Sequence, residues 1–494
     1  MWRHRKILYG LVNVGFIVLL GTMAAGDSGD QMRFLYLAML FPLCSAPILF
    51  EKPLNGPYAL LAMFLAIYFV FYGVGDLSAA WTGRFPKADP SALSEAELVI
   101  LVGGVLLVLA YRAGITLVSR ANSATAPKDW SPGMVVIAGL VLWAAGTYGS
   151  WIWNVDLVTD TSNATMRKAL GSISGARTTL LMLAQMAKPL GILIIAYAQT
   201  VYRRPWMLPI LLAVVAVQFV YGFVVDIKGE AMVGGILVIL TKTLVSGKLP
   251  KMWLAGAALF VVFGFPILQA HRNAAGARSL NHAETAQNLV KAVTNAIDSK
   301  DKVNEGRRRA QTFFERASLK TSVELIVTRT GNRVEFQDGA TLTPIVATFV
   351  PRIIWPTKPS IPVGQVMNRE FHVSQVADTY ISPSHLGELY WNFGWPGVIG
   401  GMILIGLILG YVGGRCDLSS GTSITRLLIA VITIRQMMMG FEGTIAVAYV
   451  VWLRSIAAVW LLHLVLARAK RGIDRTATLQ QEIPGSSYHR ALQA

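Results

Sequence analysis

Charged side chains are scarce in this sequence. Only 14% of its 494 residues are Asp, Glu, Lys or Arg, against roughly 25% in an ordinary soluble domain. Cysteine is nearly absent, because Cys44 and Cys416 are the only two, and so no disulfide framework is implied. The sequence also lacks an internal repeat and a pair of interrupted apolar segments in corresponding halves, which many transporters show.

Apolar residues take the place of the missing charge. They make up 54% of the chain, and the mean hydropathy is +0.52. Apolar runs of roughly 17 to 25 residues, long enough to cross a hydrocarbon core, recur along the chain. We predict an all-α polytopic membrane protein with about 12 transmembrane helices, at residues 7–25, 34–50, 57–75, 97–117, 133–152, 178–200, 205–224, 231–247, 252–270, 396–414, 425–441 and 444–466.

The positive charge is distributed as in a membrane protein. The formal net charge is +17, but the basic residues lie at the ends of the apolar segments and in one loop. This pattern favours anionic lipid and phosphorylated substrates as partners and argues against nucleic acid. Lys and Arg are enriched on the side of the N-terminus, which predicts that both termini are cytoplasmic.

Segment 7–25 is too long for a typical signal peptide, and we interpret it as an uncleaved helix.

The segments define four parts of the chain. Residues 1–270 form an N-terminal bundle of about nine helices, residues 271–395 a large periplasmic loop, residues 396–466 about three further helices, and residues 467–494 a cytoplasmic tail. Helical spacing of apolar residues at 289–297 and 313–325 predicts amphipathic helices within the loop. The cluster Arg307 to Arg309 is either a surface that contacts water or lipid headgroups, or a substrate contact.

Two motifs stand out in and after this loop. They are PRIIWPTKP at residues 351–359 and SPSHLGELYWNFGWPG at residues 382–397. Together they resemble the O-antigen and exopolysaccharide repeat-unit polymerases, the Wzy-type family. Members of this family combine Pro-Arg-x-x-Trp-Pro-x-Lys-Pro with Gly-Glu-x-Tyr-x-Asn-Phe-Gly, and the second segment enters a late transmembrane helix. The predicted topology and Arg272, just past the ninth segment, add to the resemblance.

The resemblance implies a GT-C-like enzyme of the bacterial inner membrane. Its reaction is inverting glycosyl transfer between two undecaprenyl-pyrophosphate-linked oligosaccharides at the periplasmic face. Such chemistry needs cations for the developing phosphate charge and a base for the acceptor hydroxyl. No cofactor and no metal are required if arginines supply the positive charge. The expected partners are the lipid-linked glycan, membrane lipids and a chain-length regulator protein.

Cations are the candidate phosphate ligands. Arg352 follows a proline and precedes a stiff Trp-Pro turn, so its fork can meet phosphate oxygens bidentately or anchor the loop. Arg435 lies within an apolar segment, seven residues before Glu442, and is either a phosphate contact or part of a structural ion pair. The full set of predicted substrate-binding residues is Arg272, Arg278, Arg352, Lys358, Arg435, Tyr390 and Asn392.

Two residues of the second motif are candidate bases. Ser382 and Pro383 predict a helix start, which places His385 in the first turn and Glu388 three residues later on the same face. The positive end of a helix disfavours imidazolium, so His385 can be neutral and accept a proton. It can also serve as a hydrogen-bonding or capping residue. Glu388 is the competing base, or it holds a cation in place.

Two other functions fit the same features. An O-antigen ligase uses the same lipid-linked donor but transfers the glycan to the lipid A core. A flippase or transporter moves the lipid-linked glycan without joining it, and is expected to have internal repeats and a polar site at the midplane. The unusual residues of this chain lie mainly in one outer loop, which favours the polymerase.

Overall fold

The computed structural model describes residues 2–24, 31–50, 54–82, 94–118, 132–152, 175–224, 228–260, 318–350, 354–355, 363–375, 379–419, 423–441 and 443–482. Within these ranges the chain is all helical, and its single β-bridge joins Thr330 to Val334. The predicted all-α class is confirmed for the described residues.

The helices follow one another with short connections in most of the described ranges. In the first part of the chain they are α1 (Trp2–Ala24), α2 (Gln31–Phe50), α3 (Ala59–Tyr72), α4 (Val74–Thr82), α5 (Glu95–Val118), α6 (Pro132–Trp151), α8 (Gly175–Tyr202), α9 (Met207–Val224), α10 (Lys228–Ser246) and α11 (Lys251–Leu259). In the second part they are α15 (Lys320–Arg329), the short 3-10 helix η4 (Ala340–Leu342), α16 (Pro344–Phe349), α17 (Val363–Phe371), α18 (Ser384–Arg415), α19 (Ile424–Phe441) and α20 (Ile445–Glu482).

Several of these helices can cross a membrane. Five are long and apolar enough to do so within the described residues: Met32–Leu49, Glu95–Val118, Gly133–Trp151, Ser384–Arg415 and Ile445–Val465. Three shorter apolar helices cover Ile7–Gly21, Ala59–Tyr72 and Met207–Gly222. Each predicted segment overlaps a helix, although the ninth, residues 252–270, is described only as far as Phe260. The chain is therefore a helical membrane protein.

Helices α5 and α18 pack closely at the centre of the bundle. The tenth apolar segment carries a glycine stripe, which consists of Gly397, Gly401, Gly406, Gly410 and Gly414. The contact depends on this stripe, because a Cβ atom on Gly410 would lie 2.1 Å from the carbonyl oxygen of Tyr111. Gly114 of α5 meets the backbone of α18 in the same way, since a Cβ there would lie 2.4 Å from the Leu407 oxygen. Small residues let two backbones approach within a membrane, and this stripe is such a surface.

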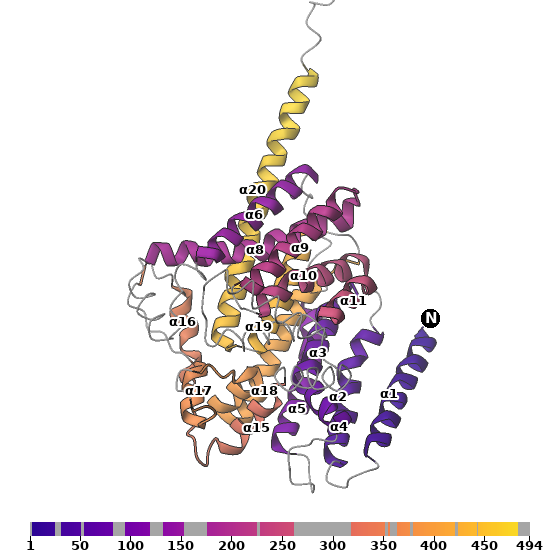
Figure 1. The fold of residues 1–494 in the computed structure, drawn as a ribbon, viewed down its shortest axis with the longest axis vertical. Coiled ribbons are helices and arrows are strands. Elements are labelled where there is room, and N and C mark those ends of the chain that lie inside the picture. Colours follow the sequence, from indigo (N-terminus) through magenta and orange to yellow (C-terminus); the bar gives the residue numbers. More distant parts are fainter. Residues whose placement is uncertain are drawn as a thin grey trace, which may run out of the picture.

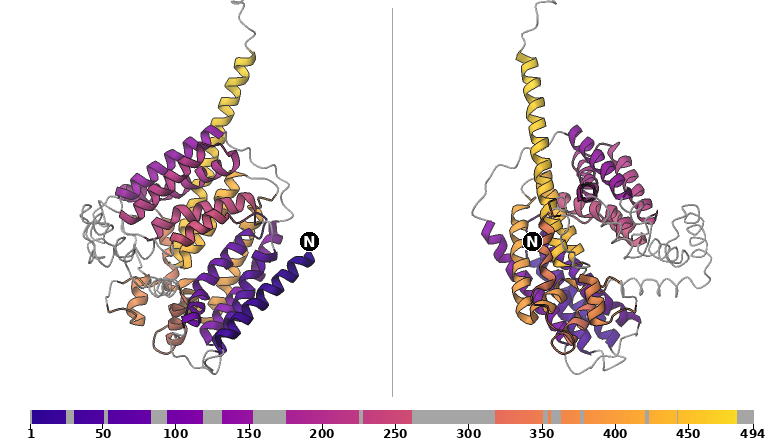
Figure 2. Two further views of the ribbon diagram at one scale, coloured as in Figure 1. Left: turned by 45° about the vertical axis from the view of Figure 1, so that its right-hand side comes forward. Right: turned by 90° about the vertical axis from the view of Figure 1, so that its left-hand side faces the viewer.

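The bundle contains two groups of helices that meet at α19. The first group consists of α1 to α5 and α18, and the second of α6 and α8 to α11 (Figure 1). Helix α19 packs on α3 and α18 of the first group and on α8 and α10 of the second. The end of α20 projects beyond both groups (Figure 2). Side chains on opposite faces of α19 therefore belong to different parts of the protein.

The described part of the predicted loop lies at one end of the first group, around the start of α18 (Figure 1). The backbone N–H of Leu319 donates to the carbonyl oxygen of Phe71 at 2.9 Å and joins this segment to α3. Helix α15 overlaps the predicted amphipathic helix 313–325 but begins at Lys320 and ends at Arg329. The predicted helix at 289–297 lies outside the described residues.

Candidate functional site

The start of α18 differs in one detail from the sequence prediction. The helix begins at Ser384, and the hydroxyl that accepts a backbone N–H of its first turn is that of Ser384, 3.3 Å from the nitrogen of Gly387. The predicted capping residue, Ser382, instead accepts the N–H of Ser384 and donates to the carbonyl oxygen of Phe441 at 3.0 Å. The predicted cap at Ser382 was therefore wrong by one residue, because Pro383 holds the N-cap position and the Ser382 hydroxyl joins α18 to the end of α19.

This helix start is held in an unfavourable backbone conformation. Ser384 has a φ of +61° and is fully buried. A non-glycine residue in the left-handed region costs about 1 to 3 kcal/mol and persists only where the surroundings fix it. The hydrogen bonds of Ser382 and Ser384 do so here, and they place His385 in the first turn, as predicted.

Glu388 is the centre of a buried hydrogen-bond network. Its Oε1 accepts the Thr341 hydroxyl at 3.0 Å, and its Oε2 accepts the backbone N–H of Ile445 at 2.8 Å. The amide nitrogen of Asn392 donates to the Thr341 hydroxyl and to the Glu388 carbonyl oxygen, both at 2.7 Å, while its Oδ1 accepts the N–H of Gly339 at 3.0 Å. The network connects η4, α18 and α20, and both carboxylate oxygens of Glu388 are occupied.

A break in α18 supplies further anchoring points. Gly394 has φ 61° and ψ −145°, and Pro396 lacks an N–H. These two residues interrupt the helical ladder, which leaves carbonyl oxygens one turn earlier without helical donors. The N–H of Gln337 donates to the oxygen of Trp391 at 3.0 Å, and that of Asp338 donates to the oxygen of Asn392 at 3.2 Å. These hydrogen bonds attach the segment that carries Thr341 to the break in α18.

The imidazole of His385 is buried without a hydrogen bond. Its exposed fraction is 1%, and within the described part of the chain neither Nδ1 nor Nε2 has a hydrogen-bond partner. The ring packs at an angle on Phe441, with 5.1 Å between centroids, and lies 5.9 Å from the ring of Tyr449. Gly440 gives it room, because a Cβ there would lie 2.3 Å from Nε2. A buried polar group without a partner is costly, and in native proteins it calls for a specific explanation.

Tyr390 points away from this network. Its hydroxyl donates to Oε1 of Glu95 at 2.8 Å, and the indole N–H of Trp395 donates to the same oxygen at 3.0 Å. Glu95 opens α5, so these bonds fasten the two central helices to each other. Tyr390 and Asn392, both predicted to bind substrate, thus form hydrogen bonds within the protein.

Arg435 belongs to a second polar cluster, on another side of α19. The ammonium of Lys188 in α8 forms an ion pair with the carboxylate of Glu230 in α10, and Gln218 donates to Oε2 of the same carboxylate at 2.9 Å. Arg435 interacts electrostatically with both Lys188 and Glu230, but it forms no ion pair or hydrogen bond within the described residues. The Lys188–Glu230–Arg435 cluster thus holds two cations and one carboxylate.

The two polar sites face different neighbours. At 3.6 residues per turn, Arg435 lies about 140° around α19 from Gly440, which contacts His385. Glu442 follows the last residue of α19 and lies outside the described residues, as do Arg272, Arg278, Arg352 and Lys358. Of the PRIIWPTKP motif only Ile354 and Trp355 are described, and they are 72% and 40% exposed. The structure therefore brings together His385, Glu388 and Asn392, and it places Arg435 with α8 and α10.

A third cluster joins the loop to the bundle and was not identified from the sequence. Nζ of Lys320 pairs with Asp76 of α4 and, at 2.6 Å, with Oε1 of Glu97 of α5, and lies 4.5 Å from the ring centroid of Tyr36. Burial acts to lower the pKa of Lys320, but the carboxylates of Asp76, Glu97 and Glu324 outweigh it and raise the pKa. The only local sequence signal was a lysine at the start of an apolar helical pattern.

No group of three or more His, Cys, Asp or Glu side chains suited to a metal ion occurs within the described ranges. The described residues of the α18 site offer groups for proton transfer and hydrogen bonding.

Comparison with known proteins gives one match. The family described as "Domain of unknown function (DUF8712)" matches residues 153–470, a range that contains every residue singled out above as a catalytic or phosphate-binding candidate. No curated protein and no solved structure matches the chain.

Proposed function

The chain belongs to the family described as "Domain of unknown function (DUF8712)", and we propose that it is a polysaccharide polymerase of the bacterial inner membrane. It joins undecaprenyl-pyrophosphate-linked oligosaccharide repeat units at the periplasmic face. In this proposal the twelve apolar segments all cross the membrane, and both termini are cytoplasmic. The resemblance of the PRIIWPTKP and GELYWNFG motifs to Wzy-type polymerases supports the choice.

The proposed reaction forms one bond and breaks one bond. A hydroxyl oxygen of the acceptor repeat unit attacks the anomeric carbon of the growing chain from the face opposite the leaving group. The bond from that carbon to the pyrophosphate oxygen breaks, and the lipid pyrophosphate leaves with the electron pair. A base takes the hydroxyl proton, and fixed cations stabilise the charge that develops on the pyrophosphate.

His385 carries the proposal, because its imidazole combines burial with the absence of a partner for either ring nitrogen among the described residues. A neutral imidazole in this state has one lone pair free to accept a proton. It lies at the end of a membrane helix, on a strained turn, which is where strain is commonly tied to function. We assign His385 as the base that contacts the acceptor hydroxyl.

Glu388 is better suited to positioning than to proton transfer. Both of its oxygens already accept hydrogen bonds, from Thr341 and from the N–H of Ile445. By holding the start of α18 against α20 and η4, the carboxylate fixes the neighbouring turn that carries His385. A positioning residue of this kind affects catalysis through the geometry of another group.

Cations of the predicted set bind the two pyrophosphates in this proposal. Arg435 is the described member, and its positive charge is not matched by a carboxylate of its own in the described part of the chain. Arg272, Arg278, Arg352 and Lys358 complete the set by their place in the sequence and by the resemblance. No metal or cofactor is part of the proposed mechanism.

Reconstitution tests the function directly. The purified protein in liposomes is given lipid-linked repeat units as the only substrate, and the products are separated by length. A polymerase makes a ladder of products. A ligase makes none until lipid A core is supplied, and a flippase makes none under either condition, so either of these results overturns the proposal.

Variants test the assignment of the base within the same assay. We expect His385→Gln to reduce polymerisation roughly 10² to 10⁴-fold, the usual contribution of a general base. His463→Gln is the matched control, because that imidazole already bonds to the Thr425 hydroxyl at 2.9 Å in the C-terminal helices. Ladder formation at the wild-type rate by a well-folded His385→Gln protein would remove His385 from the mechanism.

Arg352→Ala tests the phosphate side. We expect it to abolish long chains without removing the protein from the membrane, with a loss of roughly 10² to 10³-fold, as for one oxyanion donor. A normal ladder from this variant would show that Arg352 anchors the loop instead.

A further inference from the structure

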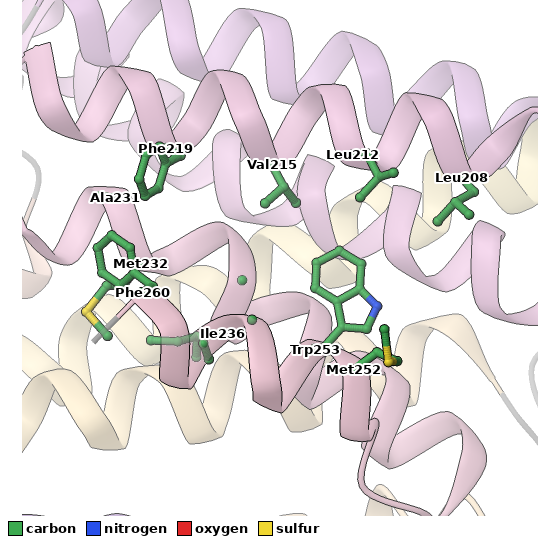
Figure 3. A pocket seen from close by; sticks show the side chains of 13 residues that line it. Leu208, Leu212, Val215, Phe219, Ala231, Met232, Ile236, Met252, Trp253 and Phe260 are labelled. Atoms are coloured by element: carbon green, nitrogen blue, oxygen red, sulfur yellow. The ribbon is translucent and has the colours of Figure 1, made fainter. Parts of the chain in front are cut away.

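An apolar groove runs between α9, α10 and α11, away from the α18 site. It has a volume of about 530 Å³, and its lining includes Leu212, Val215, Phe219, Met232, Ile236 and Trp253. In Figure 3 the side chains of α9 face those of α10 and α11 across the gap. The lining residues contain no charged side chain, so the groove suits a hydrocarbon chain and not a sugar.

Two glycines of the groove lining leave open space inside the groove. Gly235 of α10 and Gly256 of α11 both line it, and a Cβ atom built on either would meet nothing within 4 Å. Glycine costs about 1 kcal/mol relative to alanine inside a helix. Gly114 and Gly410 allow close helix contact, but Gly235 and Gly256 make no such contact. Because they lack a side chain, these two glycines leave space for a bound ligand.

One end of the groove lies near a cluster that, among the described residues, has more cations than carboxylates. Ala231 and Phe219 line that end, and each is next in sequence to a member of the ion-pair network, Glu230 and Gln218. The Lys188–Glu230–Arg435 cluster around them carries two cations and one carboxylate. An uncompensated cation within a membrane is costly, so this end favours an anionic headgroup.

Lys242 lies near Trp253 of the groove lining but does not itself line the groove. The Nζ atom of Lys242 donates to Oε1 of Gln199 and lies 6.0 Å from the ring centroid of Trp253.

From Leu208 to Phe219 the groove follows α9 for about 17 Å at 1.5 Å per residue. That length covers roughly half of a hydrocarbon core of about 30 Å, which is enough to hold the first part of a long lipid chain.

We propose that this groove binds the isoprenoid chain of a polyprenyl diphosphate, with the diphosphate at the end next to Glu230 and Arg435. The inference rests on the proposed function for the identity of the lipid, and it deepens that function by placing the lipid of the substrate on α9, α10 and α11.

The test fills the groove. Gly235→Leu and Gly256→Leu, combined in one protein, add side chains where there is open space, so the helices are expected to keep their packing. Gly400→Leu is the matched control, because Gly400 also has nothing within 4 Å of a built Cβ but lies in α18, away from the groove. Affinity for a polyprenyl diphosphate without sugar is measured by binding to the purified protein in detergent, with phosphatidylglycerol as competitor.

We expect the double variant to bind the polyprenyl diphosphate at least about tenfold more weakly, since lost burial of two methylene groups suffices for that change. The Gly400→Leu protein is expected to bind like wild type. Unchanged affinity in the double variant overturns the inference. So does a loss of phosphatidylglycerol binding alone, which would make the groove a site for bulk phospholipid.

A second measurement does not depend on filling the groove. Met252 lines it and is 85% exposed, so a photoreactive benzophenone amino acid can replace it with little effect on packing. Irradiation is expected to cross-link the polyprenyl diphosphate at position 252 but not at Leu404 of α18, which is 59% exposed. Equal cross-linking at both positions overturns the inference.

The outcomes also separate this inference from the proposed function. Lipid binding that depends on the groove, without any polymer in the liposome assay, would retain the groove and reject the polymerase. A normal polymer ladder from the double variant, with unchanged lipid affinity, would retain the polymerase and reject the groove.

Discussion

Oε2 of Glu388 in α18 accepts the backbone N–H of Ile445, the first residue of α20, at 2.8 Å. The nitrogen at the start of a helix has no partner inside that helix, and this one is fully enclosed by protein. A carboxylate 57 residues earlier in the sequence therefore caps α20. The same carboxylate lies one turn after His385, so the cap also fixes the position of the proposed base.

Substitutions of Glu388 should distinguish its role as a cap of α20 from the role of its negative charge. We expect Glu388→Ala to reduce the free energy of unfolding by about 1 to 3 kcal/mol, because it leaves the buried N–H of Ile445 without an acceptor. Glu388→Gln should retain most of the stability, since its amide oxygen can still accept that N–H while its NH₂ group faces the Thr341 hydroxyl. Thermal unfolding in detergent measures both. If Glu388→Gln is as unstable as Glu388→Ala, the negative charge itself is required.

Gly440→Ala should displace His385 without changing it. The new Cβ would lie 2.3 Å from Nε2 and 2.5 Å from Cε1 of His385, so the ring must move. We expect polymerisation to fall toward the roughly 10² to 10⁴-fold loss that follows removal of a general base. Gly400→Ala, at a position with open space, is the control and should be fully active. Normal activity of a folded Gly440→Ala protein would show that the site tolerates a moved imidazole.

Removal of Lys320 should release the loop segment from the bundle. Its ammonium lies between Asp76 and Glu97, and the exposed fractions of the Lys320 and Glu97 side chains are both 5%. Lys320→Met leaves buried carboxylates without a cation, which costs about 3 to 5 kcal/mol for such pairs. We expect this loss in thermal unfolding, together with faster proteolysis in residues 318–350. A change within experimental error would mean that water reaches the carboxylates.

The pH dependence of stability, compared between wild type and Lys320→Arg, tests the charge of Lys320. The pKa of Lys320 is raised from 10.5 in the folded protein by Asp76, Glu97 and Glu324, against the effect of burial. A cation with a raised folded pKa contributes stability that is fully present below its unfolded pKa and is lost as the pH rises through the folded value. The stability difference between wild type and Lys320→Arg should therefore be constant from neutral pH to 10.5. Above that pH it should shift in favour of arginine, which stays charged.

The sequence was most informative where local pattern determines structure. Apolar runs predicted the positions of the helices, because only a helix satisfies its own backbone in a hydrocarbon core. The spacing of the glycine stripe in the tenth segment favours close helix contact, and Gly410 makes such a contact with α5. The motif SPSHLGELYWNFG predicted a helix with His385 in its first turn, although Pro383 and not Ser382 holds the N-cap position.

The sequence was least informative about pairing between distant residues. Lys188 and Glu230 are 42 positions apart, and Lys320 and Asp76 are 244 apart, so neither pair leaves a local spacing. The alternative ion pair of Arg435 with Glu442 stays a prediction, because Glu442 lies outside the described residues. Tertiary packing decides which charges meet, and the side of α19 on which Arg435 lies follows from the neighbours α8 and α10.

Arg435 should show opposite effects on stability and activity. Its guanidinium has no ion pair or hydrogen bond within the described residues, while the nearby carboxylate of Glu230 is already paired with Lys188. Placing a cation in the membrane costs roughly 2.5 to 3.5 kcal/mol on insertion scales. We therefore expect Arg435→Gln to unfold at the same temperature as wild type or higher, yet to polymerise roughly 10² to 10³-fold more slowly, because it removes the proposed phosphate contact.

Lys188→Gln is the control for that prediction, because it leaves Glu230 without its bonded cation and should lower stability. Arg435→Lys keeps the charge but loses the bidentate fork, and should recover part of the activity. The measurements are thermal unfolding in detergent and ladder formation in liposomes on the same preparations. If Arg435→Gln instead lowers stability by as much as Lys188→Gln and leaves polymerisation intact, the arginine is a structural counter-charge to Glu230, and the phosphate contacts must come from other cations.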